Sequence, residues 1–196
     1  RHGHIDRFEP LTLLAAVAAV TDRIGLICTA STTYNEPYAL ARKFASLDHI
    51  SDGRAGWNVV TGWSEEEALN FSRDALMDHS ERYERANEFF DVVTGLWDSW
   101  DDDAFVRDKA EGRYFRPEGM HLLNHKGPHY QVRGPLNLAR SPQGHPVIAQ
   151  AGGSGPGRDL GARIADIIYT GQKDKGIAQE FYADMKARVA AAGRDP

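Results

Sequence analysis

The sequence predicts an α/β fold built on a parallel sheet. Residues 24–30 and 55–60 are short apolar runs with the composition of strands buried on both faces, and a helix-like segment separates them. A strand, a helix and a strand in so short a span pair in parallel through a right-handed crossover. Two later apolar runs, residues 147–151 and 167–169, add two more strands to the expected sheet.

The composition fits a single globular domain over residues 1–196. The chain is 41% hydrophobic and 26% charged, which provides enough apolar surface for a core. Its formal net charge of −5 gives no basic field for nucleic acid or an anionic membrane surface, so neither partner is expected. The single cysteine, Cys28, lies in a predicted strand, and this usage suits the reducing cytoplasm.

The first helix is expected at residues 9–22, where Pro10 begins it and Asp22 lies at its end. Residues 11–20 form the most apolar ten-residue stretch of the chain. This stretch is shorter than the ~20 apolar residues that cross a bilayer, and it lacks the basic segment of a signal peptide. We therefore expect a buried helix.

The crossover helix lies between the first two strands. Pro37 is expected in its first turn, where the missing N–H costs no hydrogen bond. The sequence Ser51-Asp52-Gly53 ends it, because glycine readily adopts the left-handed conformation. Apolar residues recur at helical spacing in between and predict one buried stripe, formed by Leu40, Ala41, Phe44, Ala45 and Leu47.

Residues 65–77 are expected to be partly helical, with a solvent-exposed acidic run at residues 65–67. The next helix begins at Asp78 or Ser80, and Glu81 follows Asp78 at the spacing of a capping box. Its apolar stripe extends over about four turns. The residues of this stripe are Tyr83, Ala86, Phe90, Val93 and Trp97.

Residues 98–146 interrupt the alternation of strands and helices. This stretch contains acidic residues, scattered aromatics and two Gly-Pro pairs, and a hairpin is expected around residues 125–127. So long a segment of weak regularity inside a domain indicates an insertion rather than a linker. We expect it to cover the mouth of the fold and to contribute to a subunit contact.

The sequence after residue 151 predicts a glycine-rich loop at residues 152–157, a helix at 158–165 and a last helix that ends at Gly193. The apolar stripe of the last helix consists of Ile177, Phe181, Met185 and Val189. Four strands are too few to close an eight-stranded barrel of about 250 residues. The fold is then an open sheet or the middle of a longer (β/α)8 barrel; the absent initiator Met and the abrupt end favour the barrel.

Polar residues follow the first two strands, at the edge where parallel α/β folds bind ligands. Small hydroxyl and amide groups there can hydrogen-bond a flat heteroaromatic ligand, although the same groups also cap strand ends. They are Thr29, Ser31, Thr32, Asn58 and Thr61.

The glycine-rich segment at residues 150–157 lies between a predicted strand and a predicted helix. Its backbone N–H groups, the Ser154 hydroxyl and the helix N-terminus together predict a phosphate site, the alternative being an ordinary glycine-rich connection. The pattern is not the G-x-G-x-x-G of dinucleotide-binding folds. His79 and Tyr83, at the start of a helix, can face the same mouth, and the alternative for Tyr83 is a core position.

No metal site is proposed. His121, His125 and His129 recur every four residues, but Gly127-Pro128 forbids the continuous helix that would bring them together. The acidic run at residues 101–103 lacks the spacing of a calcium-binding loop.

Three long blocks resemble the flavin-dependent monooxygenases of the bacterial-luciferase superfamily. In order, they are CTASTTYNEPYALARKFASLDHISDGRAGWNVVT, HSERYERANEFFDVVTGLWDSWDDDA and HKGPHYQVRGPLNLARSPQGHPVIAQAGGSGPGRD. They are most similar to the branch of nitrilotriacetate, EDTA, sulfone and long-chain-alkane monooxygenases. The resemblance covers almost the whole chain.

The resemblance implies a luciferase-like (β/α)8 barrel that uses reduced FMN supplied by a separate NAD(P)H:flavin reductase. Oxygen adds to the reduced flavin to give a C4a-hydroperoxide, which oxygenates a small organic substrate in a site that excludes water. It also implies a homo-oligomer, a dimer or a tetramer. Family members are longer, with an acidic flavin ligand before residue 1 and a candidate catalytic histidine after residue 196.

By position, the resemblance places Thr29 and Ser31 at the border of the isoalloxazine ring. It places Asn58, Thr61 and Gly62 along the ring and the ribityl chain. The phosphate is assigned to the Tyr83 hydroxyl, the Ser154 hydroxyl and two backbone amides, those of Gly153 and Gly155.

Two departures from the family leave other functions open. Relatives often have a serine in place of Gly62 and a small polar residue or histidine in place of Trp63, so one flavin contact is missing and Trp63 reshapes the substrate pocket. A non-catalytic flavin-binding or structural subunit is therefore the alternative, and a barrel enzyme for a phosphorylated metabolite is a third. No catalytic acid or base is assigned; His79 is the first candidate to examine.

Overall fold

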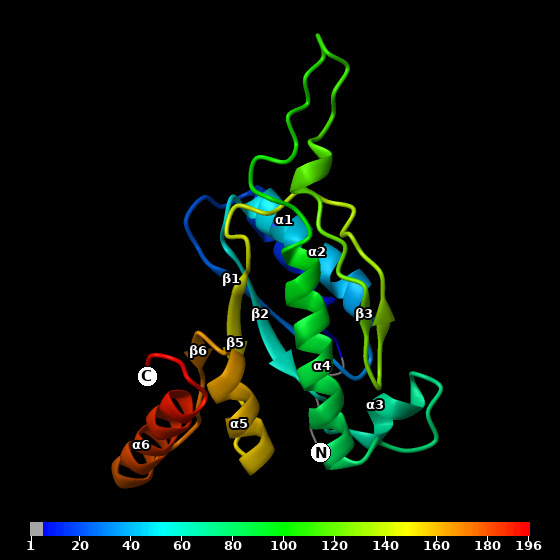
Figure 1. Cartoon of the computed structure of the whole chain (residues 1–196). Helices are drawn as coiled ribbons and strands as arrows, with labels where there is room; N and C mark the ends of the chain where they lie inside the picture. The colour runs from blue at the N-terminus through cyan, green and yellow to red at the C-terminus, as the bar shows by residue number, and fades with distance from the viewer. Residues whose placement is uncertain (1–5) are drawn as a thin grey trace.

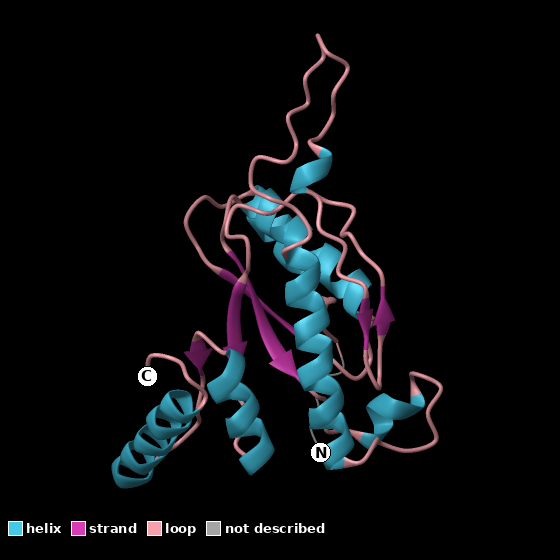
Figure 2. Cartoon of the chain, in the orientation of Figure 1, coloured by secondary structure: helices cyan, strands magenta, loops and turns pink. Residues whose placement is uncertain are grey.

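The computed structural model describes residues 6–196, so residues 1–5 of the expected domain lie outside the described residues. Its main sheet has four parallel strands in the order β1-β2-β5-β6 (Figures 1 and 2). The strands are β1 (Leu26–Ser31), β2 (Ala55–Val60), β5 (Val147–Gln150) and β6 (Ile167–Ile168). The predicted α/β class and parallel pairing are confirmed.

The crossover helix α2 (Pro37–Ser51) forms as predicted. Pro37 occupies the first turn, and the chain leaves the helix through two left-handed residues, Asp52 with φ 54° and Gly53 with φ 78°. All five residues of the predicted stripe are buried. Parallel register then places Leu26 opposite Ala55 and continues to the ends of both strands.

The burial expected around the first helix and strand is wrong. In α1 (Pro10–Ala19), only Ala18 is buried, whereas Leu13 is 44% exposed. In β1, Leu26 and Cys28 are buried but Ile27 is 45% exposed. For β1 the reason is that helices cover one face of this sheet, while the opposite face has no covering layer within residues 6–196. Helix α1 lies on the covered side, where Ala18 packs with Leu26, Leu47 and Ala55.

Helix α4 (His79–Trp97) packs an aromatic core against the sheet. Trp57, on β2, is fully buried and lies 5.6 Å from Phe44 and 6.0 Å from Phe89, ring centre to ring centre. Its indole N–H donates to the carbonyl of Ala30 at 3.0 Å, so this buried donor is satisfied. Of the predicted α4 stripe, Ala86, Val93 and Trp97 are buried, and Tyr83 and Phe90 are partly buried.

The remaining helices are α3 (Glu65–Leu69), α5 (Gly155–Ile164) and α6 (Lys175–Ala191). Helix α5 begins three residues before the predicted start, because the Ser154 hydroxyl caps it by accepting from the N–H of Gly157 at 3.2 Å. In α6, Phe181 and Met185 are buried as predicted. Ile177, in contrast, is 54% exposed.

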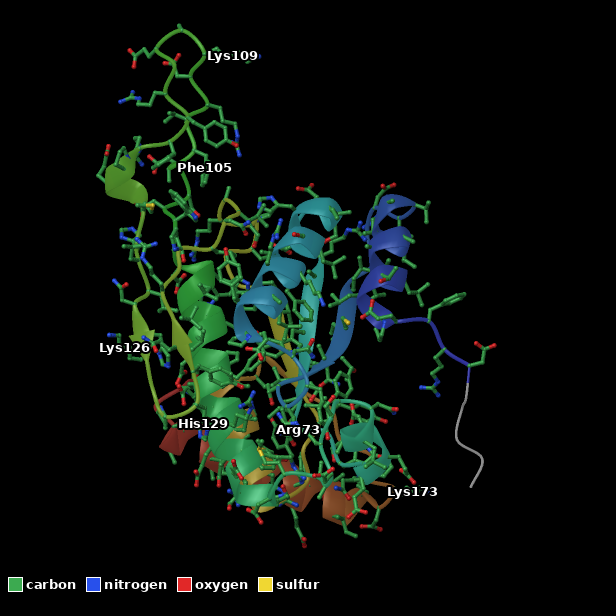
Figure 3. All side chains as sticks on the ribbon, turned by 90° about the vertical axis from the view of Figure 1, so that its right-hand side faces the viewer. Arg73, Phe105, Lys109, Lys126, His129 and Lys173 are labelled. Carbon is green, nitrogen blue, oxygen red and sulfur yellow. The ribbon has the colours of Figure 1, made fainter. Side chains whose placement is uncertain are left out.

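The insertion contains two parts that lie at different ends of the molecule. The strands β3 (His125–Lys126) and β4 (Gln131–Val132) form the predicted hairpin, and the 3-10 turn η1 (Pro117–Gly119) lies in a long arm of residues 101–119. The arm projects away from the body, at the end where α4 finishes, with Lys109 near its tip (Figures 1 and 3). Since α4 runs opposite to the strands, this is their amino edge. The arm therefore does not cover the mouth as expected; only the hairpin turns back towards the carboxyl edge.

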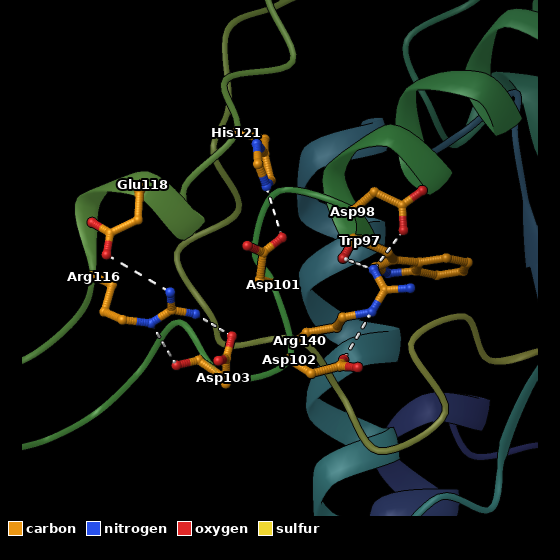
Figure 4. A network of polar contacts seen from close by, with 9 residues as sticks. All are labelled: Trp97, Asp98, Asp101, Asp102, Asp103, Arg116, Glu118, His121 and Arg140. Atoms are coloured by element: carbon orange, nitrogen blue, oxygen red, sulfur yellow. Dashed lines mark hydrogen bonds and ion pairs between the residues drawn. The ribbon is translucent and has the colours of Figure 1, made fainter.

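Ion pairs hold the base of the arm (Figure 4). Arg140 pairs with Asp98 at 2.5 Å and with Asp102 at 3.2 Å. Arg116 pairs with Asp103, and His121 lies 2.8 Å from Asp101. Each carboxylate of the acidic run at residues 101–103 thus has a partner in this chain, an arginine for Asp102 and Asp103 and a histidine ring for Asp101.

A buried carboxylate joins the insertion to the crossover unit. Asp48, on α2, is fully buried and accepts from the backbone N–H of Gln143 at 3.0 Å and from the Gln143 amide at 2.6 Å. It also accepts from the N–H of Ala55 at 3.3 Å, at the start of β2. One side chain therefore fixes the helix, the strand and the end of the insertion together.

A second carboxylate anchors the hairpin to α4. Glu88 accepts from the His125 ring at 2.8 Å and from the backbone N–H groups of His129 and Tyr130, each at 2.9 Å. Burial alone raises the pKa of Glu88, but these hydrogen bonds outweigh it and hold the pKa below its ordinary value.

None of the helices within residues 6–196 combines the length and apolar character needed to cross a membrane.

We predict that Asp48→Asn lowers the free energy of unfolding by about 2–4 kcal/mol, because the new amide group presents hydrogens to donors that need an acceptor. Denaturant titration measures the change. Asp52→Asn is the matched control on the same helix end, since asparagine tolerates the left-handed conformation, and it should leave stability nearly unchanged. Equal effects of the two substitutions would contradict the role given to Asp48.

We predict that Glu88→Gln destabilises the protein by about 2 kcal/mol near neutral pH. Because the folded-state pKa of Glu88 is depressed, its stabilisation is present above the ordinary value of 4.5 and is lost as the pH falls through the folded value. The difference between wild type and variant should therefore stay constant from neutral pH down to about the ordinary value of 4.5 and shrink as the pH falls below it. Glu84→Gln, on the exposed side of the same helix, is the control, and a pH-independent difference would refute the assignment.

Candidate functional site

The carboxyl ends of β1 and β2 bring their polar residues together. Thr29 lies directly opposite Asn58, whose side-chain amide donates to the Thr29 hydroxyl at 3.0 Å. Thr29 is exposed on the uncovered face of the sheet and Asn58 is partly exposed beside it. This pair therefore presents hydrogen-bonding groups on the face that helices do not cover.

The other polar residues at this edge also hold the backbone. Ser31 is buried, and its hydroxyl accepts from the N–H of Thr33 at 3.0 Å. Thr33 donates in turn to the carbonyl of Thr61 at 2.6 Å, which joins the ends of the two strands. Thr61 is buried, with its hydroxyl turned towards the carbonyl of Gly62 at 3.5 Å. The strand-end role considered for Ser31 and Thr61 is therefore present in the structure.

Gly62 follows β2 in a conformation that favours glycine. Its φ is +73°, and a Cβ there would lie 3.1 Å from the Glu67 carboxylate and 3.1 Å from the Tyr34 ring. It would lie 3.8 Å from the Ser31 hydroxyl. A serine at this position would be strained, so the glycine is a consequence of the local backbone. Trp63 follows it and is largely exposed.

The glycine-rich loop after β5 reaches the same edge. Ser154 is exposed at the N-terminus of α5, and a Cβ at Gly153 or Gly155 would meet no atom within 4 Å. The first backbone N–H groups of a helix have no intrahelical partner and carry partial positive charge. The loop is therefore an open cradle of donors that fits an anionic group such as a phosphate.

Tyr83 converges on this cradle from α4. A Cβ placed on Gly157 would lie 2.9 Å from the Tyr83 hydroxyl and 3.1 Å from the Ser154 hydroxyl, so the two hydroxyls flank one point. His79 packs against Tyr83, with ring centres 5.0 Å apart. The ends of the strands and the glycine loop therefore meet at one edge, as predicted. Tyr83 is partly buried against the core, and its hydroxyl reaches this edge beside Gly157.

The sequence analysis placed Gln150 in the glycine-rich segment but gave it no role of its own. Gln150 ends β5 and is buried, and its side chain accepts from the N–H of Gly152 at 2.8 Å, which shapes the start of the cradle. A Cβ on Gly161 would lie 2.9 Å from its carbonyl oxygen. The signal for Gln150 was its position directly before the glycines.

Sequence reasoning also missed a polar cluster beside Gly62. Glu67 contacts the Gly62 backbone region, and its burial raises the pKa of the carboxyl group. Burial also raises the pKa of Tyr34, and the nearby Glu67 raises it further against the opposing effect of Arg73 and Arg82. These residues are far apart in sequence, and only the folded chain brings them together.

The three histidines at four-residue spacing lie apart and have separate partners. His121 pairs with Asp101, His125 with Glu88, and the His129 ring lies against Tyr130. No group of three or more His, Cys, Asp or Glu side chains within the described chain is arranged to hold a metal ion.

Comparison with known proteins gives a family. A family model described as luciferase-like monooxygenase matches residues 1–196. N-acetyl-S-(2-succino)cysteine monooxygenase of Bacillus subtilis (strain 168) is 58% identical over 98% of this chain and 44% of its own length. Nitrilotriacetate monooxygenase component A of Aminobacter aminovorans is 58% identical over 95% of this chain and 41% of its own.

Solved structures show the same fold. The crystal structure of a long-chain alkane monooxygenase superposes with a TM-score of 0.94 at 39% identity and covers 98% of this chain and 44% of its own. Riboflavin lyase with modified FMN and riboflavin gives a TM-score of 0.93 at 40% identity, over 97% of this chain and 43% of its own. This chain spans less than half the length of the curated relatives that it matches. The family model and these relatives each cover nearly all of this chain, and the chain belongs to the luciferase-like monooxygenase family.

Proposed function

We propose that this chain is part of a two-component monooxygenase that uses reduced FMN and O2 to oxygenate a small organic substrate. The observation that carries the proposal is the convergence of the Tyr83 and Ser154 hydroxyls on the open cradle at the start of α5. The names of relatives at 58% identity are those of monooxygenases, and FMN is named in a structural neighbour at 40% identity. The sheet would then be the middle of a (β/α)8 barrel, with residues 98–146 as an insertion.

The residues present fit the phosphate of FMN. A phosphate at the cradle would accept from the Ser154 hydroxyl, the Tyr83 hydroxyl and two backbone N–H groups, those of Gly153 and Gly155. No arginine is required, since the helix N-terminus supplies the opposing partial charge. His79, packed on Tyr83, would orient that phenol.

The flavin ring would extend from the cradle along the strand ends. Thr29 and Asn58 present a hydroxyl and an amide on the uncovered face, where they would hydrogen-bond the polar edge of the ring. Ser31, Thr61 and Gly62 would border it through the backbone that they hold in place. Bound reduced flavin supplies two electrons that activate O2, so that one oxygen atom enters the substrate and the other leaves as water. The chain's own part is to position the ring and to limit water.

The partners follow from the same reading. A separate NAD(P)H:flavin reductase would supply reduced FMN, which is consistent with a relative named as component A of its enzyme. We also propose a cytoplasmic homo-oligomer, to which the arm of residues 101–119 contributes. Tyr114 and Val106 on that arm are exposed, as expected for a segment that packs against another subunit.

The substrate class is indicated by the relatives' names, which include carboxylated compounds, sulfones and alkanes. The two relatives at 58% identity are both named for carboxylated substrates. A non-catalytic flavin-binding subunit is the second candidate, and Gly62 followed by the exposed Trp63 favours it, since both depart from the usual family pattern.

We predict that Ser154→Ala and Tyr83→Phe each raise the Kd for FMN about tenfold, because each removes one hydrogen bond to a charged phosphate. Quenching of flavin fluorescence measures the Kd. Tyr182→Phe, which alters an exposed phenol on α6, is the control. Unchanged FMN binding in both site variants would refute the phosphate assignment.

We predict that the full-length protein, with a flavin reductase and NADH, oxidises reduced FMN and forms about one oxygenated product per reduced flavin in the presence of substrate. Oxygen uptake and product analysis measure this ratio. Oxidation of reduced flavin without product for every substrate class tried would favour the non-catalytic subunit instead.

A further inference from the structure

The region beside Gly62 contains buried polar atoms that have no hydrogen-bond partner. They are the Tyr34 hydroxyl, the Tyr130 hydroxyl, and the Nε atoms of Arg82 and Arg85. Arg82 and Tyr130 are each only 7% exposed, whereas Tyr34 and Arg85 are partly exposed. Leaving a buried donor unpaired costs free energy, and the cost is larger for a charged one.

These groups belong to one neighbourhood. Arg73 and Arg82 both act electrostatically on Tyr34, and Arg73 and Arg85 both act on Tyr130, so Arg73 is common to the two phenols. The Arg73 guanidinium lies 5.9 Å from the centre of the Tyr34 ring, and that of Arg85 lies 4.6 Å from the Tyr130 ring. Figures 1 and 3 agree that the segment carrying Arg73 and the hairpin tip at His129 lie towards the same end of the molecule.

None of Arg73, Arg82 and Arg85 forms an ion pair within residues 6–196. Arg82 donates to the backbone carbonyl of Met77 at 2.7 Å, and Arg85 stacks on Tyr130. Arg188, in contrast, pairs with Asp184 at 3.0 Å. Arg54 also lacks an ion pair within residues 6–196, but it donates to the carbonyls of Ser51, Ile24, Ala18 and Thr21. The distinguishing feature of Arg82 and Arg85 is therefore a buried Nε atom without an acceptor.

The guanidinium groups of the cluster are not paired with the carboxylates around them. Those carboxylates are Glu67 near Tyr34, and Glu36 and Glu88 near Tyr130. None of the three forms an ion pair with Arg73, Arg82 or Arg85 within residues 6–196, and Glu88 is bonded to the hairpin instead. Guanidinium groups only donate hydrogen bonds, and phenols also donate readily. The complementary ligand carries several acceptor oxygens and negative charge, which describes a carboxylate and favours bidentate pairing.

We propose that Arg82 and Arg85, with Arg73 and the hydroxyls of Tyr34 and Tyr130, form a subsite for the carboxylate groups of an acidic organic substrate. This proposal rests on the proposed monooxygenase function. The Tyr34 ring contacts the Gly62 position at the strand ends, so a substrate held here would lie beside the flavin ring. The subsite is distinct from the phosphate cradle, because the Tyr83 hydroxyl lies beside Gly157 whereas Arg85 lies over the Tyr130 ring.

The test uses the full-length protein loaded with FMN and the probe nitrilotriacetate, with its uncharged triamide as a comparison. Isothermal titration calorimetry at constant ionic strength gives the Kd of each. We expect nitrilotriacetate to bind and the triamide to bind at least about tenfold more weakly, because the amide lacks the charge that guanidinium groups recognise.

Variants then locate the binding. Arg85→Gln should weaken nitrilotriacetate binding about tenfold and Tyr130→Phe should weaken it several-fold, with FMN affinity unchanged. Arg163→Gln is the matched control, since Arg163 also lies over an aromatic ring against α4, that of Phe90 at 5.7 Å, but is paired with Asp91. Arg82→Gln is added if circular dichroism shows that it folds.

Each outcome decides the matter. Weakening by Arg85→Gln but not by Arg163→Gln supports the subsite. Absence of nitrilotriacetate binding, equal binding of the triamide, or equal effects of the two arginine variants overturns it. FMN binding is measured separately by fluorescence quenching. Bound FMN without nitrilotriacetate binding overturns only the subsite, whereas absence of FMN binding overturns the proposed function as well.

Discussion

Parallel pairing of β1, β2 and β5 is the constraint on which the rest of the structure depends. The carboxyl ends of parallel strands all lie at one edge of the sheet. Thr29, Asn58 and the loop that carries Ser154 therefore lie at the same edge as a direct result of the pairing. The crossover helix α2 enforces this pairing, and the buried Asp48 locks the helix to β2 and to the insertion. A substitution that weakens the packing of this unit would therefore move the residues at the carboxyl edge apart, even if it replaced none of them.

Helix α4 contributes residues to three parts of the molecule: the glycine-rich cradle, the arginine–tyrosine cluster and the hairpin. It can do so because these residues lie on different sides of the helix. The Tyr83 hydroxyl lies beside the cradle, Arg85 lies over the Tyr130 ring, and Glu88 holds the hairpin. The hairpin in turn places Tyr130 against Arg85. One helix therefore links the site proposed for the cofactor with the site proposed for the substrate, and its packing on Trp57 fixes both relative to the sheet.

The sequence predicted the fold well where local patterns decide structure. The stripe of α2, the limits of β2 and the hairpin in the insertion were all correct, because periodicity and turn residues act over short distances. The burial of α1 and of Ile27 was wrong, since an apolar pattern does not state which face another element covers. The prediction that the insertion covers the mouth was also wrong for the arm. Because α4 runs opposite to the strands, the insertion begins at their amino edge, and the arm lies there.

The amino-acid sequence by itself determined the order of strands and helices, the glycine-rich loop with Ser154, and the family resemblance, because each is written in contiguous residues. Only the tertiary structure decided that Tyr83 and Ser154 flank one point and that Tyr34, Arg73, Arg82, Arg85 and Tyr130 share a neighbourhood. The physical reason is that the atoms around a charged group determine whether it is buried and whether it has a hydrogen-bond partner. Those surroundings come from segments distant in sequence, so no local pattern contains them.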